Sequence, residues 1–413
     1  NMNKKLEIKI LAIGDLANNA VILKKFVKES NIHVINFHWD TASKLTDIKE
    51  NVEFFDSLKI KEQLKKILEI KDDYDLVLVQ SWSGARLAYL ANLNYIIYFV
   101  GSALRVPPFI KNPKLEYLKN PLPSLNYFER KFYKKILDNA VACVANADDL
   151  FKQLKKFRTE EIHQIGIPVD TTMFNENIKP IGKKKEKFTF LSPQRIGLAK
   201  GYDIIWNALK LCKSDFEVLQ VEWFLGQRTK EEREINANLV KNIPSQVKLI
   251  PVMKKEEIAN YYAFADAIIG QMKNGLGAAV EREAVYCKKP VVQYADPEIK
   301  FEVNGNYINS TFLPNSNNPK DVSDVIDNIV LSQEFREKLI DEEYNFVRKI
   351  ADPEMIAEKW DDLFQKIKIK NKINHQNSFN IIVKLRLLNF LIINRLYFRK
   401  IRKIFEKLIR KKS

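Results

Sequence analysis

The 413-residue sequence predicts an α/β protein with two doubly wound parallel sheets and a basic C-terminal tail. Two observations predict the sheets. Short apolar runs alternate with amphipathic segments in both halves of the chain, and loops rich in glycine and polar residues follow several of these runs. The third observation is that nearly all the net charge lies in residues 366–413. The length is sufficient for two or three domains with large cores.

The first half predicts a sheet of short strands. The predicted strands are 6–13, 33–37, 76–80, 95–100 and 141–145. In such a sheet, ligands bind at the loops that follow the carboxyl ends of the strands. The residues of these loops that we select as candidates are Gly14, Ser83, Gly101, Ser102 and Arg105, with His38 as a weaker candidate. Residues 183–187, which are mostly lysine, predict a solvated linker.

The second half repeats the pattern. Its predicted strands are 188–191, 223–225, 247–250, 267–270 and 291–293. A final helix is predicted to begin at the Asp-Pro-Glu segment 352–354 and to end near residue 366.

The most informative segment of the chain is residues 274–292. Here the turn Asn274, Gly275, Leu276, Gly277, Ala278 opens a helix that carries Glu283, and the segment ends in Pro-Val-Val. The amino end of a helix presents unpaired N–H groups and a partial positive charge, which suits a phosphate. A carboxylate near that end can accept hydrogen bonds from a ribose diol. The alternative is an ordinary strand-loop-helix unit with a surface glutamate.

A second segment adds positive charge. Arg195 and Lys200 lie in the loop between a predicted buried strand and an amphipathic run. Two such cations can neutralise a diphosphate, arginine through a bidentate fork and lysine as a point charge. The alternative is a solvated basic loop, which is common in a lysine-rich chain.

Both segments resemble the retaining GT-B glycosyltransferases of family four. Glu283-Ala284 and Pro290-Val291 match the second Glu and the Pro-Val of the family's donor loop, and Arg195 and Lys200 keep the spacing of its Gly-Arg…Lys-Gly segment. Gly275 stands where the family has its first Glu, which contacts the transferred sugar, and Asn274 lies beside it. The family consensus at the interdomain crossing is similar to residues 165–174.

The resemblance implies a GT-B fold, in which two Rossmann-like domains face a cleft. We therefore expect an N-terminal acceptor-side domain at 1–172, joined by a returning helix at 352–368. The donor domain is expected at 187–351 and the tail at 369–413.

The resemblance also implies the role of each candidate. Arg195, Lys200 and Asn274 are the implied catalytic set, and Glu283 would bind ribose. The implied donor contacts are Gly14, Arg195, Lys200, Met253, Gly275, Leu276, Gly277, Ala278 and Glu283. The implied acceptor-side contacts are His38, Ser83, Gly101, Ser102 and Arg105.

Three functional classes remain open from the sequence. The favoured class is a retaining glycosyltransferase that uses a nucleotide-diphosphate sugar and a lipid-linked or other membrane acceptor. A nucleotide-sugar-binding scaffold without turnover stays possible because of Gly275. A nucleotide-sugar epimerase would need acid/base groups, of which the sequence offers no convincing set.

Neither a metal nor another cofactor is expected. The Asp73-Tyr74-Asp75 segment precedes its strand, so its carboxylates should lie at the end away from the ligand loops. The four histidines lack metal-ligand spacing, and the three cysteines are widely separated in apolar contexts, which favours a reducing compartment. We find no secretory signal and no run of about 18 apolar residues, and so expect a cytoplasmic protein peripheral to the inner face of the cell membrane.

The C-terminal tail predicts a partner of its own. Residues 366–413 hold fifteen Lys or Arg and the single acid Glu406, a net of +14 out of +16, which leaves +2 for residues 1–365. Apolar residues fill 381–393 and recur at roughly helical spacing over 396–409. This combination suits an anionic membrane surface. A protein-docking helix is the alternative, and nucleic acid is disfavoured because it has little use for so many Leu and Ile.

Overall fold

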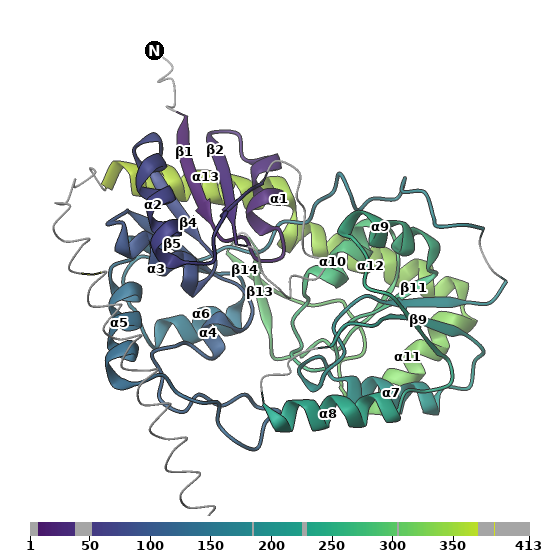
Figure 1. The fold of residues 1–413 in the computed structure, drawn as a ribbon. Coiled ribbons are helices and arrows are strands. Elements are labelled where there is room, and N and C mark those ends of the chain that lie inside the picture. The colour runs from purple at the N-terminus through teal and green to yellow at the C-terminus, as the bar shows by residue number, and fades with distance from the viewer. Residues whose placement is uncertain are drawn as a thin grey trace, which may run out of the picture.

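The protein folds into two parallel-sheet domains that lie side by side (Figure 1). The computed structural model describes residues 7–37, 52–183, 186–224, 229–303, 305–370 and Lys384. The expected α/β architecture with two Rossmann-like domains is confirmed by this arrangement. The expected boundaries at residues 172 and 187 stay predictions.

The first sheet has seven parallel strands in the order β3-β2-β1-β4-β5-β6-β7. The strands are β1 (Ile8–Ile13), β2 (Ser30–Asn36), β3 (Glu53–Phe54), β4 (Leu76–Val79), β5 (Tyr95–Phe99), β6 (Ala142–Ala145) and β7 (Ile162–Gln164). The helices are α1 (Asn19–Phe26), α2 (Ile60–Ile70), α3 (Trp82–Leu90), α4 (Ser102–Arg105), α5 (Tyr127–Asp138) and α6 (Asp148–Lys155). β1 and β4 to β6 are buried nearly throughout, as expected for parallel strands covered on both faces.

The second sheet has five parallel strands in the order β10-β9-β8-β11-β12. The strands are β8 (Thr189–Ser192), β9 (Glu217–Val221), β10 (Val247–Ile250), β11 (Ala267–Ile269) and β12 (Val291–Val292), and an antiparallel hairpin β13 (Lys300–Val303) and β14 (Asn306–Asn309) follows. The helices are α7 (Tyr202–Leu211), α8 (Lys230–Lys241), α9 (Lys255–Phe264), α10 (Ala279–Tyr286) and α11 (Pro319–Leu331), with a short 3-10 turn η3 (Leu198–Lys200) before α7.

One predicted strand of this sheet is wrong. The sequence placed a strand at 223–225, whereas the structure forms β9 at Glu217–Val221. The polar residues of β9 are buried with partners, because Glu217 pairs with Lys248 at 2.5 Å and the amide of Gln220 donates to backbone carbonyl oxygens. Within the described part of the predicted stretch, residues 223 and 224, Phe224 makes an isolated bridge to Ile196.

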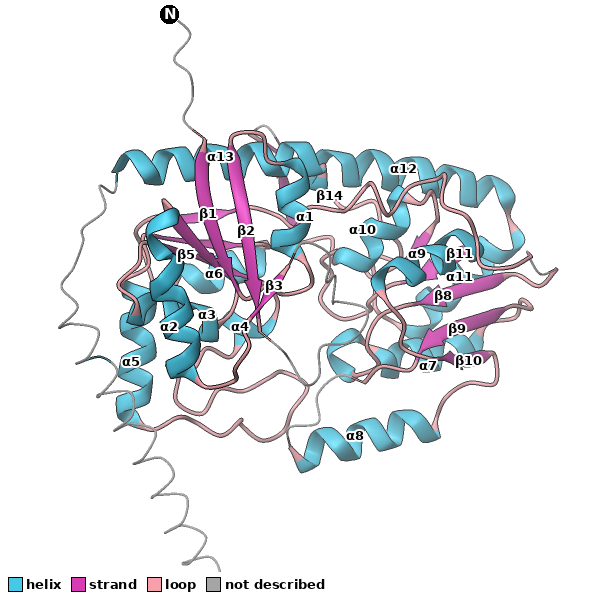
Figure 2. Cartoon of the chain, turned by 45° about the horizontal axis from the view of Figure 1, so that its top comes forward, coloured by secondary structure: helices cyan, strands magenta, loops and turns pink. Residues whose placement is uncertain are grey.

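Two consecutive helices connect the domains. α12 (Gln333–Ala351) packs on α10 of the second domain, and α13 (Pro353–Lys370) returns to α1 of the first (Figure 2). The expected returning helix is present, four residues longer than the predicted end near 366. In the first domain, Trp360 of α13 lies edge-on to Tyr98 of β5 with ring centroids 4.9 Å apart.

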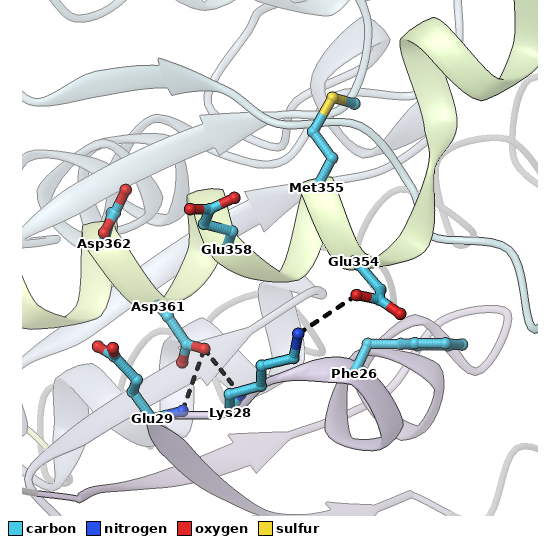
Figure 3. Close-up of a pocket in the computed structure, with 8 residues that line it drawn as sticks. All are labelled: Phe26, Lys28, Glu29, Glu354, Met355, Glu358, Asp361 and Asp362. Carbon is cyan, nitrogen blue, oxygen red and sulfur yellow. Dashed lines mark hydrogen bonds and ion pairs between the residues drawn. The ribbon is translucent and has the colours of Figure 1, made fainter.

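Asp361 fixes α13 to the start of β2. Its carboxylate accepts hydrogen bonds from the backbone N–H of Lys28 at 2.8 Å and of Glu29 at 3.2 Å, and from the Ser30 hydroxyl at 2.6 Å. A hollow of about 350 Å³ lies beside these contacts and is lined by four more acidic residues (Figure 3). The hollow lies at the amino-terminal end of β2, away from the ligand loops. The contacts of Asp361 beside it hold α13 against the first domain.

Replacing Asp361 with alanine is therefore expected to destabilise the protein by roughly 2–4 kcal/mol, because one buried and two partly buried donors lose a charged acceptor. Urea unfolding of the variant measures this loss. Asp362→Ala is the matched control, since Asp362 is exposed on the same helix. Equal unfolding free energies for the two variants would contradict the docking role of Asp361.

A long loop of the first domain also reaches the second domain. We call this loop, residues 106–126, the strap. Its Leu115, Leu118 and Leu122 form an apolar cluster that includes Ile235 of α8. The backbone N–H of Lys119 donates to Glu231 of α8 at 2.6 Å, and this contact is the main cause of the lowered pKa of Glu231. The domains thus meet at the strap as well as at the chain crossings.

Candidate active site

The candidate donor residues gather at the topological switch of the second sheet. β8 and β11 are neighbours although β9 and β10 lie between them in the sequence, and the loops after their carboxyl ends, residues 193–201 and 270–278, meet there. The carbonyl of Lys200 accepts from the Met272 N–H at 2.9 Å, and the Lys200 ammonium donates to the Gln271 side chain at 3.2 Å. The two loops predicted from separate sequence motifs are therefore in direct contact.

Glycine makes this contact possible. Gly201 has a φ of +78°, and a Cβ there would lie 2.9 Å from the Met272 Cβ. Gly275 has a φ of +62°, and a Cβ there would lie 2.4 Å from the Asp296 Cβ. A side chain at either position would thus combine backbone strain with a steric clash. At Gly275 this shows why the position holds no glutamate: the turn itself requires glycine.

The two predicted cations, Arg195 and Lys200, are close enough for their charges to influence each other. Burial lowers the pKa of Lys200, the Glu281 carboxylate opposes this, and the positive charges of Arg195 and Arg105 lower it further. Arg195 itself stacks over the Trp223 ring, with 4.9 Å from its guanidinium carbon to the ring centroid. Since Arg105 belongs to the first domain, the carboxyl edges of the two sheets approach each other here.

Glu281, which the sequence analysis did not single out, anchors the start of α10. It is fully buried, and its carboxylate accepts from the Gln271 N–H and from the Ala278 N–H, both at 2.9 Å. The second contact is half of a capping box, which the Glu three residues after Ala278 could have signalled. Gly270 leaves room for this carboxylate, because a Cβ there would lie 2.6 Å from it. The helix start and its free N–H groups are thereby held in place.

Glu283 lies on another side of α10. It is 5% exposed, forms an ion pair with Lys255 at the start of α9, and accepts from the Tyr262 hydroxyl at 3.2 Å. Burial raises the pKa of Glu283, and Lys255 opposes the shift. Lys255 closely follows Met253, the buried candidate for the nucleobase side. Asn274, Gly277 and Ala278 are partly exposed in the turn before α10, whereas Leu276 is buried.

The loop after β1 is held by a buried polar network at the switch of the first sheet. The N–H of Gly14 donates to the Ile35 carbonyl at 2.9 Å, and its φ is +75°. The Asp15 carboxylate accepts from the N–H groups of Ala20 and Val21 and from the Gln80 amide. Burial nevertheless raises the pKa of Asp15 to about 6.

This shift makes a pH prediction. The folded state binds the Asp15 proton more tightly than the unfolded state, in which the pKa of Asp15 is 3.8. The contribution of protonated Asp15 to the free energy of unfolding is therefore complete below pH 3.8 and is lost as the pH rises to about 6. The wild type should lose on the order of 3 kcal/mol relative to Asp15→Asn over this window. Unfolding of both proteins by urea at several pH values measures the difference. A difference that does not change with pH would contradict the assignment.

The acceptor-side candidates occupy neighbouring loops of the first domain. Ser83 lies in the first turn of α3, and Ser102 begins α4. Gly101 has a φ of +64°, and no atom lies within 4 Å of a Cβ built on it. Arg105 pairs with Asp149 of α6 at 2.6 Å. His38 lies outside the described residues, so its predicted place stays untested.

The Asp73-Tyr74-Asp75 segment has the predicted location. It precedes β4 and lies at the amino-terminal edge of the sheet, where Asp75 accepts from the Lys9 N–H and pairs with Lys368 of α13, both at 3.0 Å. Among the described residues no cluster of His, Cys, Asp and Glu could hold a metal ion. Across the same residues, no helix combines the length and the apolar character that crossing a membrane requires.

Comparison with known proteins decides the family. Residues 173–346 match the family described as glycosyl transferases group 1. This segment, which holds both candidate donor loops, belongs to that family. The protein is therefore a glycosyltransferase, as the resemblance of the donor loops implied. No curated protein is similar enough in sequence to match it.

Solved structures of glycosyltransferases share the fold of this chain. Anabaena HepE, in complex with UDP and glucose, is 15% identical with a TM-score of 0.61, over 87% of this chain and 100% of HepE. A glycosyltransferase from Rickettsia africae is 19% identical with a TM-score of 0.60, over 89% and 100% of the two chains. Sucrose-phosphate synthase from Thermosynechococcus elongatus is 15% identical with a TM-score of 0.61, over 88% and 100%. The expected GT-B fold is thus confirmed.

Proposed function

We propose that this glycosyltransferase moves a sugar from a UDP-sugar to a membrane-bound, lipid-linked acceptor with retention of the anomeric configuration. The observation that carries the proposal is the convergence of Arg195 and Lys200 at the switch point beside the amino end of α10. The nucleotide is proposed from HepE, whose complexes hold UDP and UDP-glucose. Glycan or glycolipid assembly is the process that this chemistry serves.

Each donor group has a proposed partner. Arg195 and Lys200 bind the diphosphate, and the backbone N–H groups of Gly275, Leu276 and Gly277 approach its oxygens. The N–H groups of Gly14 and Ala278 are engaged by Ile35 and Glu281, so these two residues contact the donor without donating a backbone hydrogen bond. Diphosphate binding would also favour the charged form of Lys200, whose pKa burial lowers. Met253 lies on the nucleobase side, and Asn274 contacts the transferred sugar.

The ribose role of Glu283 requires a rearrangement. Its carboxylate is engaged by Lys255 and Tyr262, so the ribose diol must replace or share one of these partners. Lys255 has only 14% of its side chain exposed, so its ammonium would stay close to the bound nucleotide. We assign Glu283 a binding role and no catalytic step.

Catalysis is proposed to be electrostatic. As the bond from the sugar C1 to the diphosphate breaks, negative charge grows on the leaving phosphate, and Arg195 and Lys200 stabilise it. These cations take the place of a divalent metal. Ser83, Gly101, Ser102 and Arg105 line the acceptor side.

The proposal is tested by incubating the purified protein with a panel of UDP-, GDP- and ADP-sugars, with and without membrane extract. We expect turnover of a UDP-sugar that requires the extract and survives EDTA. Turnover that EDTA abolishes would contradict the metal-free donor site. If the protein binds none of these nucleotide sugars, the proposal as a whole is contradicted.

A further inference from the structure

The first turn of α5 exposes two aromatic side chains. Tyr127 is 53% exposed and Phe128 is 64% exposed, and their rings meet edge to face at 5.5 Å. A capping box fixes the start of this helix, because Asn126 accepts from the Glu129 N–H at 2.9 Å and Glu129 accepts from the Asn126 N–H at 3.2 Å. The fold therefore holds both rings outward at a rigid helix end.

Basic side chains follow these rings along α5, and one of them lies against Tyr127. Lys131 and Lys135 are exposed on α5, and the Lys131 ammonium lies 4.7 Å from the centroid of the Tyr127 ring. Residues 106–138 contain seven Lys or Arg and three acidic residues, a net of +4. Because residues 1–365 carry a net charge of +2 in total, the residues of 1–365 outside 106–138 have a net charge of −2. The positive charge of the folded body is thus concentrated in the strap and α5.

Lys384 of the basic tail contacts the first domain near the same helix. The ammonium of Lys384 donates to the Tyr89 carbonyl at 3.0 Å and lies 4.1 Å from the centroid of the Tyr89 ring. Tyr89 of α3 in turn packs edge-on against Phe132 of α5, with ring centroids 5.7 Å apart. Lys384, the one tail residue that the structure describes, is therefore linked to α5 through Tyr89.

We propose that Tyr127, Phe128, Lys131 and Lys135 form a membrane-contact surface that binds anionic lipid together with the tail. Aromatic rings prefer the headgroup level of a bilayer, and lysines contribute attraction to anionic lipids. This inference rests on the proposed function, because it assumes an acceptor in the membrane. A docking site for a protein is the competing occupant.

The surface would orient the enzyme on the bilayer. α5 runs opposite to the parallel strands, so its first turn lies toward their carboxyl ends, where Ser83, Gly101 and Arg105 are found. Contact of this turn with lipid places the acceptor loops of the first domain toward the bilayer. The second domain, with its donor loops, would then lie farther from the membrane.

A label at position 128 tests the contact directly. The full chain with Phe128→Cys is labelled with a polarity-sensitive fluorophore and mixed with vesicles of phosphatidylglycerol and phosphatidylcholine. The native thiols compete poorly, since Cys143 and Cys287 are buried and burial raises the pKa of Cys212 to about 12. We expect a blue shift on vesicle binding. Tyr307→Cys is the control, because Tyr307 is 72% exposed on β14 of the second domain, and its label should not shift.

Vesicle sedimentation gives the second readout. Tyr127→Ser/Phe128→Ser should reduce binding of the full chain by about tenfold, whereas Tyr307→Ser should leave it unchanged. If the full chain binds vesicles but the label at 128 stays in water, the inference is overturned and the tail anchor stands. If the full chain does not bind anionic vesicles, the inference and the proposed membrane acceptor both fail. If the label at position 128 shifts to the blue only when a membrane-protein extract is added, the inference is overturned. The surface then binds a protein partner.

Discussion

Arg195→Ala is expected to weaken donor binding at least about tenfold, and Lys200→Ala should have an effect of the same order. Each variant removes one charge-assisted contact to the diphosphate, at a cost of roughly 1.5–3 kcal/mol. Lys200→Ala also removes the link to Gln271, so it should loosen the contact between the two donor loops. Turnover should fall with affinity, because the same charges stabilise the leaving phosphate.

Titration calorimetry with UDP measures this effect without knowledge of the sugar or the acceptor. Lys210→Ala is a matched control, since Lys210 is an exposed lysine of α7, the helix that follows the donor loop. The control should bind UDP like the wild type. Unchanged affinity in both Arg195→Ala and Lys200→Ala would remove these residues from the donor site.

Truncation at residue 372 is expected to abolish most binding to anionic vesicles while donor affinity remains. The tail carries most of the net charge of the chain, and each basic residue near an anionic surface contributes roughly 1 kcal/mol. α13 ends at Lys370, so the cut spares both sheets and the helices that connect them. Of the described contacts, the cut removes those of Lys384 with Tyr89 of α3 and with Asn92, which follows that helix.

Sedimentation with vesicles at increasing salt measures the loss. Binding of the intact chain should weaken as salt rises and should keep a salt-resistant part from buried Leu, Ile and Phe side chains. UDP affinity is the control for folding of the truncated protein. If the truncated chain sediments as well as the intact one, the tail is not the anchor, and a protein-docking role takes its place.

The sheets could be predicted from the sequence wherever strands are continuous apolar runs. β4 and β10 begin at the predicted residues, and β1, β5, β6 and β8 lie within two residues of their predicted limits. β9 was missed because Glu217 and Gln220 interrupt its apolar pattern, and their burial depends on partners distant in the sequence, Lys248 and Gln194. The short edge strands β3 and β7 carry too few residues to show a pattern.

The positions of the two candidate loops could be read from the sequence because local motifs define them, but the directions of their side chains could not. Their role in donor binding stays a prediction. Neighbouring residues on a helix point about 100° apart. Glu281, Arg282 and Glu283 therefore face the loop 270–278, the interdomain crossing and α9 in turn. Their contacts are to Gln271, Ile167 and Lys255. A motif fixes which residues are present, and the packing of α10 decides which of them can reach a ligand. Gly275 is the clearest case, because the motif does not show that the backbone has a positive φ at this position. That angle is set by the fold of the turn.

The anomeric configuration of the product tests the central claim most directly. The UDP-sugar found in the donor panel is supplied with a carbon-13 label at C1, together with the membrane acceptor, and the product linkage is analysed by NMR. Retaining transfer predicts that the labelled carbon has the same anomeric configuration in the product as in the donor. A product with the inverted configuration would contradict the proposed mechanism.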